Sequence, residues 1–242
     1  MKLPQTSPGD ASELRSRKNP PCLSIVIPTS NEEAQIHRIL ERALAEKITE
    51  VIVVDGGSTD KTREIASAYP VRVLRSTPGR ANQMNTGAAA ASSNILLFLH
   101  ADTLPQPGFA EEAINALRRP GVIAGAFDLA IDSDSASLRL IEKCVAWRSR
   151  KRRMPYGDQG LFLSRSTFEE LGGFPEMPAL EDYEFLRRLR RRGEIAIAPL
   201  SAVTSARRWR ERGIWRTTAL NQFCILAYRA GIPIKSIARW LK

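Results

Sequence analysis

Short strand-like and helix-like segments alternate through the first hundred residues, and this alternation constrains the fold more than any other feature of the sequence. Each apolar run of strand length precedes a polar stretch whose apolar residues recur at helical spacing. Ser30 and Glu33 have capping-box spacing, which predicts a helix start near Ser30. Strands are predicted over residues 23–29, 50–57, 71–76 and 94–100, and helices over residues 30–44, 58–69 and 81–92. The repeated order predicts an α/β fold, with a mostly parallel central sheet and helices on both faces.

The second half of the chain is less regular. Helices are predicted over residues 108–119, 136–150, 181–193 and about 214–241, and strands over residues 121–131, 160–165 and 194–199. Because no internal repeat or linker interrupts the pattern, we expect residues 22–242 to form a single domain. Residues 1–21 are polar and weakly basic, and we expect them to form a disordered tail.

The chain carries a formal net charge of +10, with 36 Lys and Arg against 26 Asp and Glu. The excess is concentrated in three clusters, at residues 148–153, 187–192 and 207–212. Such clusters suit polyphosphate ligands, anionic membrane surfaces or nucleic acid, and a solvated basic face is the alternative for each of them. Aromatic residues make up 7% of the chain, too few to interleave with the basic clusters, so we expect no nucleic-acid partner.

The cysteines and the apolar runs indicate the cellular compartment in which the protein is expected. Cys22, Cys144 and Cys224 are scattered and predict neither a disulfide framework nor a thiolate metal site. No apolar run approaches the ~20 residues that cross a bilayer, and residues 1–21 lack the apolar stretch of a secretory signal. We therefore expect a cytoplasmic protein. The basic, apolar residues 221–242 favour core packing or a homodimer contact, with weak docking at the inner-membrane surface as the less favoured interpretation.

Polar residues follow three of the predicted strands, at residues 28–31, 55–57 and 100–102. Ligands of such sheets bind beyond the carboxyl ends of the strands, so these stretches are expected to converge on one binding edge. Asp102 is the candidate metal ligand, because carboxylate and diphosphate oxygens together suit Mg²⁺ or Mn²⁺. The chain has two histidines, which excludes a His-rich zinc site.

Two further loops carry candidate ligand contacts. Asp55 at a strand end suits a base or ribose, although a tight turn capped by the aspartate explains the same residues. The glycines that follow allow close backbone approach, but they lack the spacing of a dinucleotide fold or a P-loop. Arg80 precedes a helix of small residues and is well placed for a phosphate or a base edge.

Glu181 and Asp182 lie together at a predicted helix start. Acidic residues favour helix N-termini in any protein, and this explanation needs no chemistry. One of them could instead act as a general base. Because adjacent residues do not share a helix face, at most one is expected to point at a reacting group.

Six segments together resemble the family 2 glycosyltransferases, in order and in spacing, over residues 23–193. They are LSIVIPTSNEE, VIVVDGGSTDKT, GRANQMNTGA, LLFLHADTLP, GLFLSRSTFEELGGFPE and LEDYEFLRRL. The segments HADT, PYGDQG and SARRWRERG further resemble a bacterial subgroup associated with radical-SAM and selenodomain proteins and linked to arsenosugar biosynthesis.

The resemblance implies a GT-A fold, a nucleotide-diphosphate sugar donor, a divalent cation and an inverting transfer to an acceptor hydroxyl. Residues 22–105 would form a Rossmann-like nucleotide-sugar-binding half, and residues 106–242 the acceptor half with the C-terminal helices. Asp102 would bind the cation, and Asp182, beside Glu181, would deprotonate the acceptor. The implied nucleotide-sugar site comprises Pro28, Thr29, Glu32, Asp55, Gly57, Ser58, Arg80, His100, Ala101 and Asp102.

The sequence departs from the family pattern at the metal motif, where His100 replaces the first acid, and no histidine follows it. The QxxRW of processive synthases is also absent, which favours a single transfer. Asp158 and Gln159 are expected to face the acceptor, and Arg207 and Arg208 to close over the diphosphate as a lid.

Two alternatives stay open. A nucleotidyltransferase would want a Gly-rich basic loop after the first strand, where this chain reads PTSNEE. A catalytically degenerate nucleotide-sugar-binding protein is motivated by His100 alone.

Overall fold

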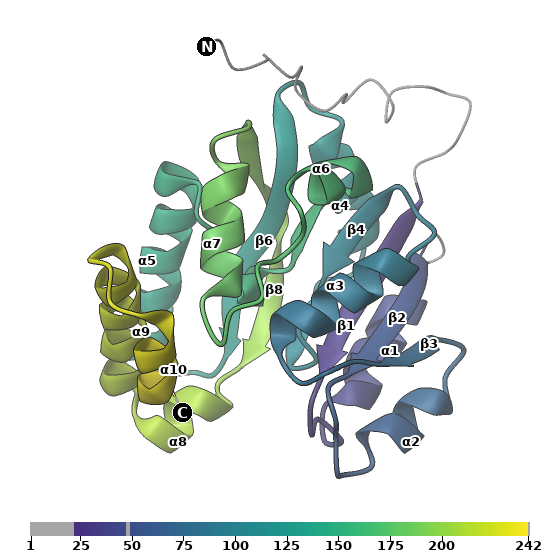
Figure 1. Cartoon of the computed structure of the whole chain (residues 1–242), viewed down its shortest axis with the longest axis horizontal. Coiled ribbons are helices and arrows are strands. Elements are labelled where there is room, and N and C mark those ends of the chain that lie inside the picture. The colour runs from purple at the N-terminus through teal and green to yellow at the C-terminus, as the bar shows by residue number, and fades with distance from the viewer. Residues whose placement is uncertain (1–21, 47–48, 242) are drawn as a thin grey trace.

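The computed structural model describes residues 22–46 and 49–241, so the predicted tail at residues 1–21 lies outside the described part (Figure 1). Its eight described strands form one sheet in the order β3-β2-β1-β4-β7-β6-β8-β5. The strands are β1 (Leu23–Thr29), β2 (Thr49–Asp55), β3 (Arg72–Arg75), β4 (Ile95–Phe98), β5 (Thr103–Pro105), β6 (Val122–Asp132), β7 (Leu161–Ser164) and β8 (Glu194–Ser205). Strands β3, β2, β1 and β4 run parallel to one another, whereas β7 runs antiparallel to both of its neighbours, β4 and β6.

Helices cover both faces of the sheet, as the sequence predicts. The longer helices are α1 (Ile36–Leu44), α3 (Arg80–Ala90), α4 (Phe109–Leu117), α5 (Ala136–Arg152), α7 (Glu181–Leu189), α9 (Ile214–Arg229) and α10 (Ile234–Leu241). Short turns of helix are α2 (Thr62–Ser67), η2 (Gly157–Gln159), α6 (Arg165–Glu170) and α8 (Arg207–Arg212). Residues of α1 and α4 share one buried cluster with the sheet, and residues of α3 and α7 share another. Figure 1 shows α3 and α7 in front of the sheet.

Strand β7 shows how the two clusters form on opposite faces. Phe162 contributes to the cluster under α1 and α4, whereas Leu161 and Leu163 contribute to the cluster under α3 and α7. Successive side chains of a strand point to opposite faces, so an unbroken apolar run fills both clusters. The fully apolar run of β4, buried along its length, follows the same logic.

The first helix and two strands are among the elements that differ from the sequence prediction. The first helix begins at Ile36 after an uncapped Gln35, so the capping box predicted at Ser30 is wrong. Strand β8 continues to Ser205, six residues beyond the predicted end, because it pairs along most of β6. Strand β5 is a short pairing with β8 that has no alternating pattern of its own. None of the helices within the described residues combines the length and apolarity that crossing a membrane requires.

Candidate functional site

The carboxyl ends of the central strands meet at one edge, as predicted. Thr29 and Asp55 are register partners at the ends of β1 and β2. The amide of Leu99 donates to the carbonyl of Val26, which brings the following His100 turn beside β1. Three polar loops therefore lie side by side at this edge, where parallel sheets bind ligands.

The Asp55 turn is built as a tight strand-to-helix connection. The Asp55 carboxylate is 1% exposed and accepts backbone hydrogen bonds from Gly57 at 3.1 Å and Ser58 at 3.2 Å. Gly57 has φ +98°, a conformation that requires glycine. Thr29 is equally buried, and its hydroxyl donates to the carbonyl of Val54. These bonds shape the turn, and contact of Asp55 or Thr29 with a nucleotide stays a prediction.

The loop that follows β1, where a helix was expected, is hydrogen-bonded to the segment that follows β2. The amide of Asn31 donates to Oγ of Ser58, and the amide of Glu32 donates to Oγ1 of Thr62. Asn31 Oδ1 accepts from the amide of Thr59. Asn31 has φ +56°, which asparagine tolerates better than most residues. Sequence reasoning placed Asn31 in the polar stretch at residues 28–31 but gave it no role, although asparagine before an acidic pair is a signal for such a turn.

Gln83 is a second residue that sequence reasoning missed. Its amide, on α3, is buried and donates to the carbonyls of Thr29 at 2.6 Å and Val54 at 2.9 Å. A Cβ at Gly56 would lie 2.8 Å from the Gln83 amide carbon, so glycine is needed there for space. A polar residue among the small residues of α3 was the available signal. Gln83 ties together the two strand ends that frame the site.

Glu181 and Asp182 point to different partners, as expected for adjacent helix residues. Glu181 is 4% exposed, and its Oε1 lies 3.4 Å from Nη1 of Arg80. Burial raises the pKa of Glu181, and the positive charge of Arg80 opposes that rise. Glu181 therefore holds Arg80 at the edge of the sheet, and Asp182 instead lines a small pocket with His100 and Gly157.

Asp182 meets His100 and Gly157 at the start of α7. The amide of Gly157 donates to Oδ2 of Asp182 at 2.9 Å. A Cβ placed on Gly157 would lie 3.1 Å from that oxygen and 3.2 Å from Nε2 of His100. Burial and the charges of Arg80 and Arg208 lower the pKa of His100 well below its usual value, so its imidazole is neutral. The result is a carboxylate beside a neutral histidine.

Asp158 and Gln159, both predicted to face the acceptor, lie in different environments. Gln159 is fully buried, and its amide donates to the carbonyl of Phe127 while its oxygen accepts from Ser149. The prediction that Gln159 faces an acceptor is therefore wrong, because its amide is occupied in fixing the turn. Asp158 Oδ1 is enclosed with no hydrogen-bond partner among the described residues. Burial raises the pKa of Asp158, opposed by the charge of Arg148.

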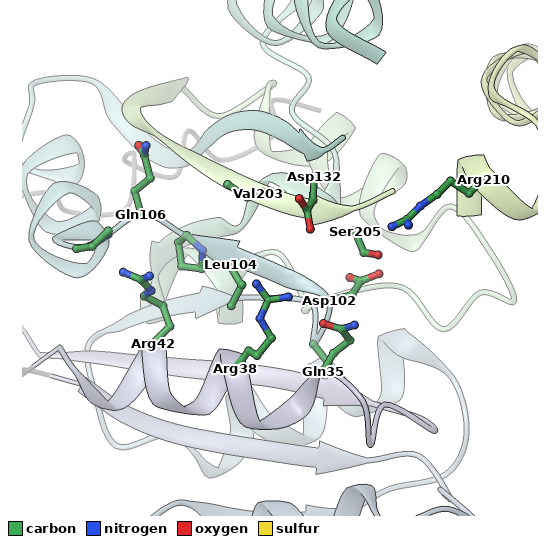
Figure 2. A pocket seen from close by; sticks show the side chains of 13 residues that line it. Gln35, Arg38, Arg42, Asp102, Leu104, Gln106, Asp132, Val203, Ser205 and Arg210 are labelled. Atoms are coloured by element: carbon green, nitrogen blue, oxygen red, sulfur yellow. The ribbon is translucent and has the colours of Figure 1, made fainter. Parts of the chain in front are cut away.

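Asp102 faces a different cavity from His100. A cavity of about 300 Å³ opens between α1, β5 and the ends of β6 and β8. Figure 2 shows Asp102, Gln35 and Ser205 at one end of this cavity and Arg42 at the other, with Arg38 between them. Within the described residues, no group of three or more His, Cys, Asp or Glu side chains is placed to hold a metal.

The Asp102 carboxylate still fits a hard cation. Among the described residues, its one hydrogen-bond donor is Oγ1 of Thr103 at a long 3.4 Å, so its oxygens are not committed to strong donors. Mg²⁺ and Mn²⁺ sites commonly combine one or two carboxylates with phosphate oxygens and water. Asp102 alone therefore suits a cation shared with a diphosphate, but not a site closed by protein ligands.

Arg207 of α8 reaches the loop that follows β1. Its Nη2 lies 3.4 Å from Oε1 of Glu32, whose second oxygen Oε2 is buried without a partner among the described residues. Burial raises the pKa of Glu32, and Arg207 lowers it. Arg207 and Arg208 are both exposed, and Arg208 is close enough to His100 to influence its pKa. The C-terminal segment thus covers the edge formed by β1 and β4.

Comparison with known families decides the assignment. The family described as Glycosyl transferase family 2 matches residues 24–169. The chain belongs to glycosyl transferase family 2. The polar strand ends, Asp102 and most of the sheet of this family 2 member lie within the matched residues.

Curated relatives carry glycosyltransferase names. The chain is 24% identical over 247 residues to the probable glycosyltransferase YdaM of Bacillus subtilis (strain 168), covering 88% of this chain and 58% of that protein. It is 26% identical over 171 residues to the glycosyltransferase AglE of Haloferax volcanii, covering 64% of this chain and 56% of the relative. The chain thus spans little more than half the length of these relatives.

Solved structures share the fold. Glucosyl-3-phosphoglycerate synthase from Mycobacterium tuberculosis, in complex with Mn²⁺ and UDP-glucose, superposes with a TM-score of 0.66 at 24% identity, covering 94% of this chain and 86% of that chain. The mannosyltransferase PcManGT from Pyrobaculum calidifontis, in complex with GDP-Man and Mn²⁺, gives 0.61 at 20% identity, covering 95% and 74%. These likenesses confirm the predicted GT-A-type α/β fold of this family 2 member.

Proposed function

We propose that this family 2 member transfers a sugar from a nucleotide-diphosphate sugar to an acceptor hydroxyl with inversion at the anomeric carbon. The observation that carries the proposal is the Asp182 carboxylate, held by the Gly157 amide at the edge where the polar loops converge. The solved relatives bound to UDP-glucose and GDP-Man support a nucleotide-diphosphate donor.

In this proposal the two halves of the site divide the work. The loops after β1 and β2 and the Arg80 side chain bind the nucleotide diphosphate, and Arg207 closes over it from α8. Asp182 accepts the proton of the acceptor hydroxyl as its oxygen attacks the anomeric carbon and the bond to the diphosphate breaks. Asp102 would hold the divalent cation, Mn²⁺ or Mg²⁺, and the bound cation would stabilise the charge that develops on the departing diphosphate.

Asp158 is proposed to bind a hydroxyl of the donor or acceptor sugar. Its enclosed Oδ1 lacks a donor among the described residues, and a buried polar atom without a partner is costly unless a ligand satisfies it. His100, held neutral by its surroundings, can accept or donate a hydrogen bond to ribose or to a cation-bound water.

Single transfer rather than processive synthesis is also proposed, because the QxxRW segment of processive synthases does not occur. The HADT, PYGDQG and SARRWRERG segments support membership of the radical-SAM and selenodomain-associated subgroup. A cytoplasmic location is proposed from Cys144 and Cys224, whose thiols form no disulfide with another described residue, as is typical of a reducing compartment.

The test is a panel of UDP-, GDP- and dTDP-sugars, each with and without Mn²⁺, read by thermal stabilisation and by slow donor hydrolysis. We expect one nucleotide to stabilise the protein, more strongly with Mn²⁺. A donor that binds without being hydrolysed, with no transfer to any acceptor, would instead support a degenerate binding protein.

The base assignment has a separate test on the donor and acceptor so identified. Asp182→Asn is expected to lower kcat by about 10²- to 10⁴-fold and to leave donor affinity unchanged. Full turnover by this variant would remove Asp182 from the mechanism, while the donor-binding result stands independently.

A further inference from the structure

The outer face of the C-terminal helix pair is apolar. Helix α9 exposes Trp215, Phe223 and Leu226, with exposed fractions of 60%, 54% and 60%. On a helix with 3.6 residues per turn these three positions fall within an arc of about 80°. Trp240 of α10 is 39% exposed, and its ring centre lies 5.4 Å from that of Phe223. These four exposed side chains lie on one side of the helix pair and are called here the apolar face.

The opposite side of α9 fixes the helix to the body of the protein. Cys224 and Ala227 are buried in a cluster with Ile237 of α10. The hydroxyl of Tyr228 donates to Glu184 of α7 at 3.1 Å. Core packing therefore accounts for one side of α9 and leaves the apolar face without a partner in the chain.

Positive charge borders the apolar face. Arg216, Arg229, Lys235 and Arg239 are all exposed. None of the four side chains has an ion pair or hydrogen bond to another described residue. Residues 213–241 contain no Asp or Glu, so neither helix carries an acid of its own to balance these charges. Figure 1 places α9 and α10 on an outer flank of the molecule, away from β2 and β3.

We propose that the apolar face and its four cations dock on the surface of an anionic lipid bilayer, with α9 and α10 lying in the headgroup plane. Tryptophan and phenylalanine side chains insert at the boundary between headgroups and acyl chains, where an apolar ring and a polar environment are both satisfied. The cations pair with anionic headgroups, which adds a salt-sensitive attraction. The protein contributes no spanning helix from its described residues, so this contact is peripheral.

Charge argues against a second copy of the chain as the occupant. Two copies joined through this face would bring four cations from each together, with no acid between residues 213 and 241 to balance them. An anionic bilayer accommodates both features, because its acyl chains take up the apolar face and its headgroups pair with the cations. The charge complementarity therefore reverses the preference of the sequence analysis, which favoured a homodimer contact over membrane docking.

Docking would also place the active edge near the bilayer. Helix α9 follows α8 after Gly213, and α8 carries Arg207, which pairs with Glu32. An acceptor held at the membrane surface would then reach the site directly. This consequence rests on the proposed function, whereas the docking itself does not.

Flotation with lipid vesicles tests the docking on the full chain. We expect the protein to float with vesicles containing phosphatidylglycerol, not with pure phosphatidylcholine vesicles, and to be released as salt is raised. A Trp147→Phe/Trp209→Phe variant keeps Trp215 and Trp240 as the remaining tryptophans. Their fluorescence is expected to shift to shorter wavelength on binding and to be quenched by brominated lipid.

Matched variants test whether binding depends on the apolar face itself or on surface hydrophobicity and net charge in general. Phe223→Ser/Leu226→Ser is expected to lower the vesicle partition coefficient at least tenfold, whereas Leu140→Ser, on α5 and 51% exposed, is expected to leave it unchanged. Arg229→Gln/Arg239→Gln is expected to lower it about 25-fold, roughly fivefold for each charge. Arg191→Gln/Arg192→Gln makes the same change in net charge at exposed positions after α7 and serves as its control.

Three outcomes would overturn the proposal. The first is equal binding to neutral and anionic vesicles, or an equal loss of vesicle binding in the Arg191→Gln/Arg192→Gln control. The second is a dimer in solution that Phe223→Ser/Leu226→Ser dissociates, without any vesicle binding by the unmodified chain. The third is binding to an RNA or DNA oligonucleotide that competes the protein off anionic vesicles through the same residues. An unchanged melting temperature and circular dichroism spectrum show that each variant is folded.

Discussion

The backbone amide of Gly157 donates a 2.9 Å hydrogen bond to Oδ2 of Asp182, joining residues 25 positions apart in the chain. The bond connects the η2 turn to the first turn of α7. It fixes the carboxylate that we propose as the base, with the neutral His100 beside it. The geometry of this contact makes Gly157 a sensitive point of the site.

Gly157→Ala is expected to lower kcat about 10- to 100-fold with little change in donor affinity. The added methyl would lie 3.1 Å from Asp182 Oδ2 and 3.2 Å from His100 Nε2, so one of these side chains must move. Even a small displacement of the Asp182 carboxylate would misalign it with the acceptor hydroxyl. The measurement is kcat against the donor Kd, and a variant that loses donor binding as strongly as turnover would contradict the assignment.

Asp158→Asn is expected to raise thermal stability slightly while lowering kcat/KM about 10- to 100-fold. The substitution removes an enclosed charge without a partner, and it weakens the charged hydrogen bond proposed for a substrate hydroxyl.

The stability effect of Asp158 depends on pH in a defined direction. Burial raises the pKa of Asp158, so the folded state holds its proton more tightly than the unfolded state. Stability contributed by this group is therefore lost as pH rises from the ordinary Asp value through the folded-state pKa. Melting curves should show that the difference between Asp158→Asn and the unmodified protein grows over this range; a constant difference would show that Asp158 ionises normally.

Glu50→Gln is expected to destabilise the fold by about 2 kcal/mol at neutral pH. The Glu50 carboxylate accepts hydrogen bonds from Ser24 at 2.6 Å and from Ser92, and pairs with Arg72 at 3.1 Å. Burial acts to raise the pKa of Glu50, but these hydrogen bonds outweigh it and lower the pKa to about 2. The stabilisation is thus present above the unfolded-state pKa and is lost as pH falls toward 2.

Urea unfolding at pH 7 and pH 3 measures this loss. The gap between the unmodified protein and Glu50→Gln should narrow at the lower pH. Glu64→Gln, at an exposed position of α2, is the matched control and should change stability little at either pH. An equal gap at both pH values would place the role of Glu50 in its shape rather than its charge.

Arg207→Gln is expected to weaken donor affinity several-fold with an unchanged melting temperature. Arg207 is 48% exposed, and its pair with Glu32 contributes only about 0.2–1 kcal/mol at such a surface. Its larger role is proposed to be contact with the diphosphate. Calorimetric titration with UDP or GDP of Arg207→Gln, Glu32→Gln and the double variant separates the two roles. Unchanged nucleotide affinity in Arg207→Gln would show that Arg207 is only a surface partner of Glu32.

Local spacing determined a large part of this protein. The apolar runs of β1, β2 and β4 and the polar residues after them were enough to predict a parallel sheet with a binding edge, and the order of the six segments was enough to predict the family. The divergence of Glu181 and Asp182 also followed from helical geometry alone. Each of these depends on residues that are close in the chain, where periodicity carries the information.

The tertiary structure decided the rest. Ser30 was expected to begin a helix, but the loop at Asn31 bonds instead to residues 27 or more positions away. Gln159 turned inward because Ser149 and Phe127 satisfy its amide. His100 and Asp102, two positions apart, face different surroundings that only the packing of α1, α7 and β8 creates. Such contacts join segments far apart in the sequence, and their hydrogen bonds leave no periodic trace in either segment.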